Sequence, residues 1–195
     1  KYILGNNPLQ PVYGKRENEV FIEKNSLEML PVENGIYHVG HDSDQFCYDN
    51  ELPVHRVFIE PYAISNKLVT NAEWMEFIND GGYKNVLIWH TEGWDWVQKN
   101  SIEAPMYWFN DKGTWTHYLL SGAEKVNPDA AVTHISYYEA FAYAQWKGMR
   151  LPTEFEWEVA QEKFSWGKRW EWTESAYLPY PNYTKPDGAL GEYNG

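Results

Sequence analysis

The sequence predicts an α+β domain in which about three helices stand among a few short strands and long loops. At residues 70–73, 136–139 and 153–156, a Ser or Thr is followed three residues later by Glu, the capping-box pattern of a helix start. Short runs of alternating polar and apolar residues, bounded by turn residues, indicate strands. Long segments without a lasting period lie between them. Such loops are either functional or evidence against the assignment of elements, and we favour a functional role because these loops hold the aromatic residues. At 195 residues, the chain is long enough for one large domain.

The first predicted helix begins at Thr70, because Glu73 lies three residues beyond it. The Gly81-Gly82 pair is expected to end this helix. Its apolar residues fall on one helix face, as expected for a helix that packs on a core, and they are Trp74, Phe77 and Ile78. Two alternating runs earlier in the chain, residues 19–23 and 35–40, predict strands.

Residues 132–160 predict two more helices joined by a sharp turn. Ser136 precedes Glu139 and Thr153 precedes Glu156 by three residues, so each pair forms a helix start. Gly148 suits a left-handed helix cap, and the residue before a proline is disfavoured in a helix, so residues 150–152 form a stiff connector. Most of the apolar surface of the two helices is expected from Phe141, Ala144, Trp146, Phe155, Trp157 and Val159.

The remaining segments read as linker and loops. Residues 1–17 contain two prolines and two glycines, and we interpret them as a linker that enters a domain of residues 18–195. The chain begins without Met and stops on a turn-like Tyr-Asn-Gly, so we expect a piece of a longer protein, truncated at the C-terminal end of the domain. Residues 83–128 and 178–195 are expected to be irregular loops, the former with short strand pieces.

Composition excludes several classes of function. Sixteen basic and twenty-eight acidic residues give a formal charge of −12, which disfavours nucleic acid as a partner by repulsion from phosphate. No window approaches the ~18 apolar residues of a membrane helix, and the first ten residues lack the pattern of a signal peptide. Cys47 is the only cysteine, so no disulfide forms within the chain and a cytoplasmic location is expected.

The sequence contains no metal site or nucleophile with a specific pattern. The six histidines occur without the spacing that places two ligands on one helix face. Asp42 and Asp44 are similar to the start of a calcium loop, but the glycine and final glutamate are missing, which favours a solvated acidic loop. Cys47 has no neighbour in sequence that would activate it. His134 leaves two interpretations open, a structural histidine or a catalytic base.

Aromatic residues are unusually frequent, with eleven Trp and fifteen Tyr. Clusters occur at residues 94–96 (WDW) and 107–109 (YWF). Large flat side chains either seal a domain with little regular structure or line a site for rings and cations. Both interpretations stay open for each aromatic residue at this stage.

Residues 150–160 (RLPTEFEWEVA), preceded by 131–140 (AVTHISYYEA), resemble the signature of the formylglycine-generating-enzyme, or sulfatase-modifying factor, domain family. Residues 69–78 (VTNAEWMEFI) and 170–172 (WEW) are similar to two further motifs of that family. The resemblance implies a C-type-lectin-like fold with little regular structure. The position of a family calcium-site Asn is occupied by Lys168, which disfavours that site here.

Four further segments resemble one branch of the family, the iron-dependent sulfoxide synthases of ergothioneine biosynthesis. They are residues 1–8 (KYILGNNP), 48–55 (YDNELPVH), 80–96 and 171–195. The resemblance implies an oxidoreductase that joins a thiol, cysteine or γ-glutamylcysteine, to hercynine with dioxygen. It also implies Fe(II) held by histidines of an N-terminal helical domain outside this chain, so the fragment alone is expected to bind no cofactor and to be inactive.

The resemblance places a substrate-pocket tyrosine on Tyr193, and we add Asn194 beside it. Weaker candidates for substrate contact are Trp94, Trp96, Tyr177 and Tyr180, for which a sealing role is equally compatible with the sequence. Catalytic residues stay unassigned. Alternatives are a non-catalytic ligand- or partner-binding module of the same fold and an ovothiol-type synthase acting on histidine. Formylglycine formation is disfavoured by the single Cys47, because that chemistry uses paired cysteines in the family.

Overall fold

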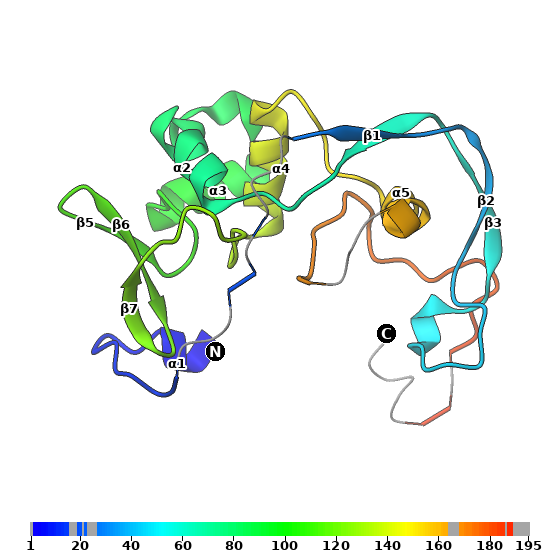
Figure 1. The fold of residues 1–195 in the computed structure, drawn as a ribbon, viewed down its shortest axis with the longest axis horizontal. Coiled ribbons are helices and arrows are strands. Elements are labelled where there is room, and N and C mark those ends of the chain that lie inside the picture. The colour runs from blue at the N-terminus through cyan, green and yellow to red at the C-terminus, as the bar shows by residue number, and fades with distance from the viewer. Residues whose placement is uncertain are drawn as a thin grey trace. The chain divides into compact units, whose positions relative to one another are not determined.

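The structure is a computed structural model that describes residues 2–15, 19–20, 22, 27–163, 168–185 and 187–188. The chain forms two compact units, each built from two separate stretches. The first unit comprises Lys1–Leu27 and Lys67–Leu151, and the second comprises Glu28–Asn66 and Pro152–Gly195. Mixed helices and small antiparallel sheets confirm the predicted α+β class (Figure 1). The described residues form five α-helices, where about three were expected.

The described residues of the first unit form four α-helices and one sheet. Its helices are α1 (Tyr2–Gly5), α2 (Asn71–Asn79), α3 (Thr91–Asn100) and α4 (Tyr137–Trp146), with short 3-10 helices η2 (Gly82–Lys84) and η3 (Val86–Ile88). Helices α2, α3 and α4 gather together (Figure 1), and aromatic rings fill the space between them. Trp74 of α2 stacks on Tyr143 of α4 with ring centroids 5.0 Å apart. Offset stacking of this kind adds about 0.5–1.5 kcal/mol beyond the burial of apolar area.

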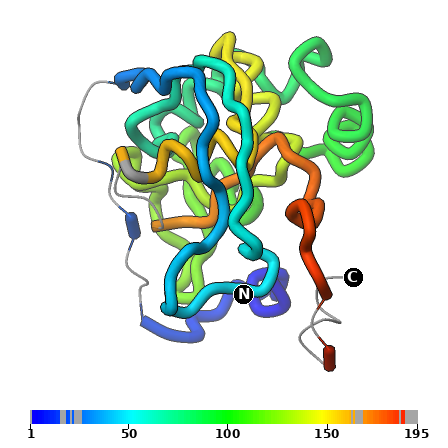
Figure 2. Tube along the Cα trace, turned by 90° about the vertical axis from the view of Figure 1, so that its right-hand side faces the viewer, coloured from blue at the N-terminus to red at the C-terminus, as the bar shows by residue number. Residues whose placement is uncertain are grey.

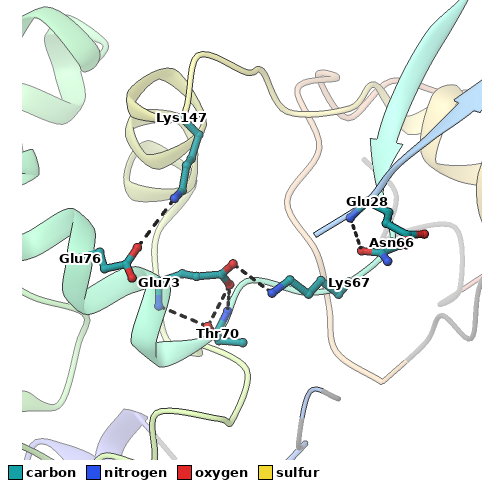
Figure 3. Close-up of polar contacts among 7 residues, drawn as sticks. All are labelled: Glu28, Asn66, Lys67, Thr70, Glu73, Glu76 and Lys147. Carbon is teal, nitrogen blue, oxygen red and sulfur yellow. Dashed lines mark hydrogen bonds and ion pairs between the residues drawn. The ribbon is translucent and has the colours of Figure 1, made fainter. Parts of the chain in front are cut away.

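The start of α2 confirms the predicted capping box. Thr70 Oγ1 accepts a hydrogen bond from Glu73 N, and the Glu73 carboxylate accepts one from Thr70 N at 2.9 Å (Figure 3). Lys67 Nζ lies 3.1 Å from the same carboxylate. Partial burial raises the pKa of Glu73, but the hydrogen bonds from Thr70 and Lys67 outweigh it and leave the pKa below its usual value. Gly81 then adopts a left-handed conformation, with φ of 80°, at the predicted end of the helix.

The apolar face of α4 differs in part from the prediction. Ala144 is buried as expected, whereas Phe141 and Trp146 are only partly buried. The deepest residue of this helix is Ala142, with Tyr143 beside it in the aromatic core. Phe141 instead stacks on the His90 ring, with centroids 3.7 Å apart. Two other details are confirmed: Ser136 caps α4 in a capping box, and Gly148 takes the left-handed conformation after the helix, with φ of 68°.

Helix α3 contradicts the expectation of irregular loops over residues 83–128. Its N-cap residue, His90, makes no side-chain capping bond, and Gly93 is a poor helix former, so local signals are weak. The helix forms because Gly93 and Val97 are buried, with Gly93 directly beneath the Tyr138 side chain of α4. Helical stability in proteins comes mainly from such packing.

A three-stranded antiparallel sheet completes the first unit. It consists of β5 (Trp108–Asp111), β6 (Thr114–Leu119) and β7 (Gly122–Lys125) in that order. The N-terminal segment runs along it, because Tyr13 N donates to Leu120 O and Tyr118 Oη donates to Pro11 O. The linker boundary at residue 17 stays a prediction. Of the strand predicted at residues 19–23, the described residues 19, 20 and 22 form no regular strand.

In the second unit, the residues that the structure places form two antiparallel strand pairs and one α-helix. Strands β1 (Met29–Val32) and β4 (Tyr62–Ser65) pair, and so do β2 (Gly35–Val39) and β3 (His55–Ile59), which confirms the strand predicted at residues 35–40. Figure 2 shows β2 and β3 as neighbouring blue and cyan tubes. Helix α5 (Glu154–Ala160) begins at the predicted Thr153 capping box and contributes the fully buried Ala160 to a core with Val32 and Ile64. The 3-10 helices η1 (Asp49–Glu51) and η4 (Gln161–Lys163) complete this unit.

The apolar surface predicted for α5 is only partly buried. Phe155, Trp157 and Val159 keep intermediate exposure, whereas Glu156 and Ala160 are the buried residues of this helix. Glu156 is buried because its carboxylate caps the start of the helix, accepting from Thr153 N at 2.8 Å. The polar Glu156 therefore lies on the buried side of α5, where the periodic pattern predicts an apolar side chain.

Candidate functional site

Three tyrosines in the C-terminal part of the second unit define the candidate site, which we call the tyrosine loop (residues 177–183). They occur at every third position, as Tyr177, Tyr180 and Tyr183. Tyr183 N donates to Tyr180 O at 2.9 Å, and Asn182 between them has a positive φ of 67°. Pro181 followed by Asn182 supplies the residues of a tight turn of the type II class. The chain therefore reverses, and the tyrosines at its two ends approach the same partner.

That partner is the 3-10 turn η1. Asn50 Nδ2 donates to Tyr177 Oη at 2.8 Å, and Tyr183 Oη donates to Asp49 Oδ2 at 3.0 Å. Two adjacent residues of η1 thus hold two tyrosines that lie six positions apart. The Asp49 contact involves a carboxylate acceptor, which makes it the stronger kind of hydrogen bond.

Tyr180, between the two, reaches two carboxylates of α5. Its hydroxyl lies 3.0 Å from Glu158 Oε2 and 3.4 Å from Glu154 Oε1. The two glutamates are four residues apart on the helix, so they share one face. The pKa of Glu154 is raised, mainly because the carboxyl group is partly buried and also because the negative charge of Glu158 lies nearby. The hydrogen bond from Tyr180 and the interaction with His55 oppose this rise without cancelling it. Burial beside both carboxylates raises the pKa of Tyr180 far above its ordinary value, so its hydroxyl stays protonated and donates.

His55 of β3 closes the cluster from the other side. Its ring lies 4.5 Å from the Tyr180 ring and 5.5 Å from the Phe155 ring, centroid to centroid. Nδ1 lies 3.2 Å from Pro53 O, which assigns the proton to Nδ1 because a carbonyl only accepts. Nε2 is buried and has no hydrogen-bond partner among the described residues. His55 therefore packs its ring against Tyr180 and Phe155 beside the tyrosine loop.

A second polar cluster lies in the first unit around the buried side chain of Glu139. The Glu139 side chain, 2% exposed, accepts hydrogen bonds from Tyr83 Oη at 2.6 Å and from Ser136 N at 2.7 Å. Burial raises the pKa of Glu139, and the hydrogen bonds from Ser136 and Tyr83 partly counter the rise. Trp74 Nε1 lies 3.4 Å from the same Tyr83 hydroxyl. Because its acceptors are satisfied within the core, we assign this cluster a structural role.

The predicted site residues fall into three groups. Tyr177 and Tyr180 lie together on the tyrosine loop, the former 72% exposed and the latter 7% exposed. Trp94 and Trp96 lie on α3, partly buried against the aromatic core of the first unit, which supports a sealing role for both. Tyr193 and Asn194 lie outside the described residues.

Sequence reasoning missed the residues that hold the tyrosine loop: Asp49, Asn50, Glu158 and Tyr183. The three-residue repeat of tyrosines was visible in the sequence and could have pointed to Tyr183. The partners of the two terminal tyrosines could not be found in this way. Asp49 lies 134 positions from Tyr183 in the sequence, and Asn50 lies 127 positions from Tyr177.

The described part of the chain contains neither a metal-binding group of side chains nor a helix that could span a membrane. No group of three or more His, Cys, Asp or Glu side chains there is arranged to hold a metal ion. None of the helices placed by the structure is both long and apolar enough to span a membrane.

Comparison with known proteins identifies relatives along most of the chain. Residues 16–189 match the sulfatase-modifying factor enzyme 1-like domain. A hercynine oxygenase of Mycobacterium tuberculosis is 39% identical over 135 residues, covering 64% of this chain and 31% of the relative. A hercynine oxygenase of Mycolicibacterium smegmatis is 33% identical over 202 aligned residues, covering 78% and 46%.

The similarity extends to another group of the same family. A formylglycine-generating enzyme of Bos taurus is 32% identical over 160 residues, covering 73% of this chain and 43% of the relative. The chain thus spans less than half the length of these three relatives. The domain match and the hercynine oxygenase relatives confirm the resemblance seen in the sequence motifs. This chain belongs to the sulfatase-modifying factor enzyme 1-like domain family.

Proposed function

We propose that this chain is the substrate-binding part of a longer non-haem iron sulfoxide synthase, an oxidoreductase that joins a thiol to hercynine with dioxygen. The observation that carries the proposal is its similarity to hercynine oxygenases over 64 to 78% of the chain. The thiol is cysteine or γ-glutamylcysteine. In this reaction the thiol and the imidazole each lose one hydrogen, one oxygen atom becomes the sulfoxide oxygen, and the other leaves as water.

The second unit offers aromatic surface that suits the trimethylammonium group of hercynine. Trp170, Trp172 and Tyr177 are 98%, 49% and 72% exposed. Electron-rich ring faces attract cations with about 0.5–2 kcal/mol per ring, and the net charge of −12 favours a cationic ligand. Substrate contact by Tyr193, Asn194, Trp94, Trp96, Tyr177 and Tyr180 belongs to this proposal. The burial of Tyr180 favours a supporting role for it within that set.

The sulfoxide-synthase reaction implies an iron ion. The described residues of this chain do not form a site that could bind it. Their His, Cys, Asp and Glu side chains form no set of three that could bind a metal. The proposal therefore assigns the Fe(II) ligands to a helical domain of the longer protein. The contribution of this chain is to bind and orient the substrates, and a cytoplasmic location completes the proposal, consistent with a single cysteine.

The test uses the full-length parent protein with Fe(II), dioxygen, hercynine and either thiol. Mass spectrometry of the products is expected to show a hercynine sulfoxide conjugate, and omission of hercynine is the matched control. Replacing hercynine with histidine distinguishes the ovothiol-type alternative, for which histidine is the better acceptor. Absence of any conjugate with every thiol and acceptor pair contradicts the proposed reaction.

The second candidate is a non-catalytic module that binds a ligand or partner through the same exposed rings, and the 98% exposure of Trp170 favours it. Calorimetry with a quaternary-ammonium ligand tests this candidate. Binding without turnover in the parent supports the module, whereas turnover rejects it. Formylglycine formation is addressed in the same preparation with a cysteine-containing sulfatase peptide, for which we expect no conversion.

A further inference from the structure

We infer that the N-terminal strap (residues 2–14) presents the surface on which the helical domain of the longer protein docks. The strap contains no charged residue, although the chain as a whole is rich in them. Single exposed apolar side chains are normal, whereas a concentration of them marks an interaction surface. Six large apolar or aromatic side chains of the strap are at least 39% exposed, and they are Tyr2, Ile3, Leu4, Leu9, Val12 and Tyr13. This inference rests on the proposed function, which assigns the Fe(II) ligands to that helical domain.

The inner side of the strap is attached to the sheet of the first unit. Tyr13 N and Gly14 N both donate to Leu120 O, at 2.7 and 3.1 Å. Tyr118 Oη of β6 donates to Pro11 O at 2.6 Å. The attachment uses mainly backbone groups of the strap, so its exposed apolar side chains are left without a covering element among the described residues.

The strap is also ordered within itself. Asn7 Oδ1 accepts from Leu9 N at 3.0 Å, and Asn7 Nδ2 donates to Tyr13 Oη at 2.8 Å. Gly5 of α1 lies so close to Tyr107 that an added Cβ would be 2.6 Å from the ring. A surface that is ordered before binding loses little conformational entropy when a partner arrives. The strap therefore has the properties of a preformed docking surface.

The occupant is identified from the relatives and from the charge of the strap. The three relatives compared above match this chain over 31 to 46% of their length, so more than half of each lies outside the matched region. An uncharged surface suits an apolar partner face, because a charged one would lose water without gaining a counter-charge. The proposed reaction also requires contact, since iron held by the helical domain has to meet substrates bound by this chain.

Hydroxyl-radical footprinting of the full-length parent tests whether the strap is covered. Leu9 is the reporter and Leu87 of η3 is the matched control, because both are leucines of the first unit and are 85% and 89% exposed. Burial of one leucine changes an equilibrium roughly 10- to 100-fold, so we expect Leu9 to be labelled about tenfold more slowly than Leu87. Equal labelling of the two leucines overturns the inference.

A photo-reactive p-benzoylphenylalanine at position 9 of the parent identifies what covers the strap. The expected product is a cross-link within one molecule to a peptide of the helical domain, identified by mass spectrometry. A covalent dimer on a denaturing gel shows that a second copy covers the strap and overturns the inference. Cross-links only to peptides of residues 1–195 within one molecule overturn it as well.

A variant then links docking to turnover. Leu9→Glu places a charge in the docking surface, and Leu87→Glu is its control. In Leu9→Glu we expect the labelling of Ile3 to rise and kcat/KM for hercynine to fall, each by about tenfold, because the docked state becomes a minor population. Leu87→Glu is expected to change neither quantity. Unchanged labelling of Ile3 in Leu9→Glu contradicts the docking role.

The footprinting result separates this inference from the proposed function. A parent that protects Leu9 but forms no sulfoxide contradicts the proposed reaction and supports docking. An active parent in which Leu9 is as reactive as Leu87 contradicts docking and leaves the proposed reaction supported.

Discussion

Tyr183 donates a hydrogen bond to Asp49, and the two residues are 134 positions apart in the sequence. The contact joins a C-terminal turn to a 3-10 turn near the start of the second unit. Asp49 begins the short 3-10 helix η1, whereas Tyr183 directly follows a turn and lies outside any helix or strand. The side-chain hydrogen bond therefore connects two segments that no strand pairing joins.

Buried hydrogen bonds to Glu139 are expected to contribute strongly to stability. Tyr83→Phe removes the donor at 2.6 Å and leaves a buried carboxylate with one partner fewer. We expect a loss of about 1–3 kcal/mol in the free energy of unfolding, measured by urea denaturation. Tyr138→Phe is the control, because it removes a similar bond to the exposed Glu92, where water replaces the hydroxyl. Equal losses in the two variants would contradict this assignment.

Glu171 is expected to make stability depend on pH. Burial raises its pKa from 4.5 to about 7, partly countered by a hydrogen bond from Trp157. Between these values the unfolded chain releases the proton while the folded protein keeps it, so stability falls as pH rises. Glu171→Gln removes this slope. Relative to the parent, the variant is expected to gain about 1–3 kcal/mol between pH 5 and pH 8.

Urea unfolding at several pH values measures the gain for Glu171→Gln. Glu174→Gln, an exposed carboxylate three residues away, serves as the control and is expected to show no such gain. A Glu171→Gln variant that follows the parental pH dependence would rule out the burial effect.

Glycine is required at position 93 because α3 packs closely against Tyr138 there, and not because of its backbone conformation. Gly→Ala in a helix normally stabilises by about 1 kcal/mol. Here an added Cβ would lie 2.7 Å from Tyr138 Cβ, so one helix must move. We expect Gly93→Ala to destabilise the protein by about 1–3 kcal/mol. Gly14→Ala, where a Cβ meets nothing within 4 Å, is the control in the same thermal unfolding series. A stabilised Gly93→Ala variant would refute the close approach.

Thr153 is expected to determine where α5 begins. Its hydroxyl accepts from Glu156 N at 3.2 Å, and loss of an N-cap side chain costs about 0.5–2 kcal/mol. Thr153→Ala should show this loss in thermal unfolding, whereas Thr153→Ser keeps the acceptor and should retain most of the stability. If both variants lose the same amount, the methyl group rather than the cap is responsible.

Predictions from sequence succeeded where the cause of structure is local. Three capping boxes and two left-handed glycines lie within a few residues of the helix ends they define. Helix α3 was missed because His90 offers no capping bond and the helix depends on Tyr138, far along the chain. The partners of the tyrosine loop were missed for the same physical reason, since no local pattern encodes a contact across more than one hundred residues.

The division of the chain has a consequence for its biosynthesis. The second unit begins at Glu28, is interrupted at Asn66 and resumes only at Pro152. Its strands β1 to β4 therefore leave the ribosome long before α5 and the tyrosine loop, which are needed to cover them. Translation proceeds at about 5–20 residues per second, so the apolar side chains of the strand pairs stay exposed for several seconds before α5 is synthesised. The first unit likewise needs its second stretch, Lys67–Leu151, to complete its core. Neither unit can therefore complete its core while the early part of the chain is being synthesised.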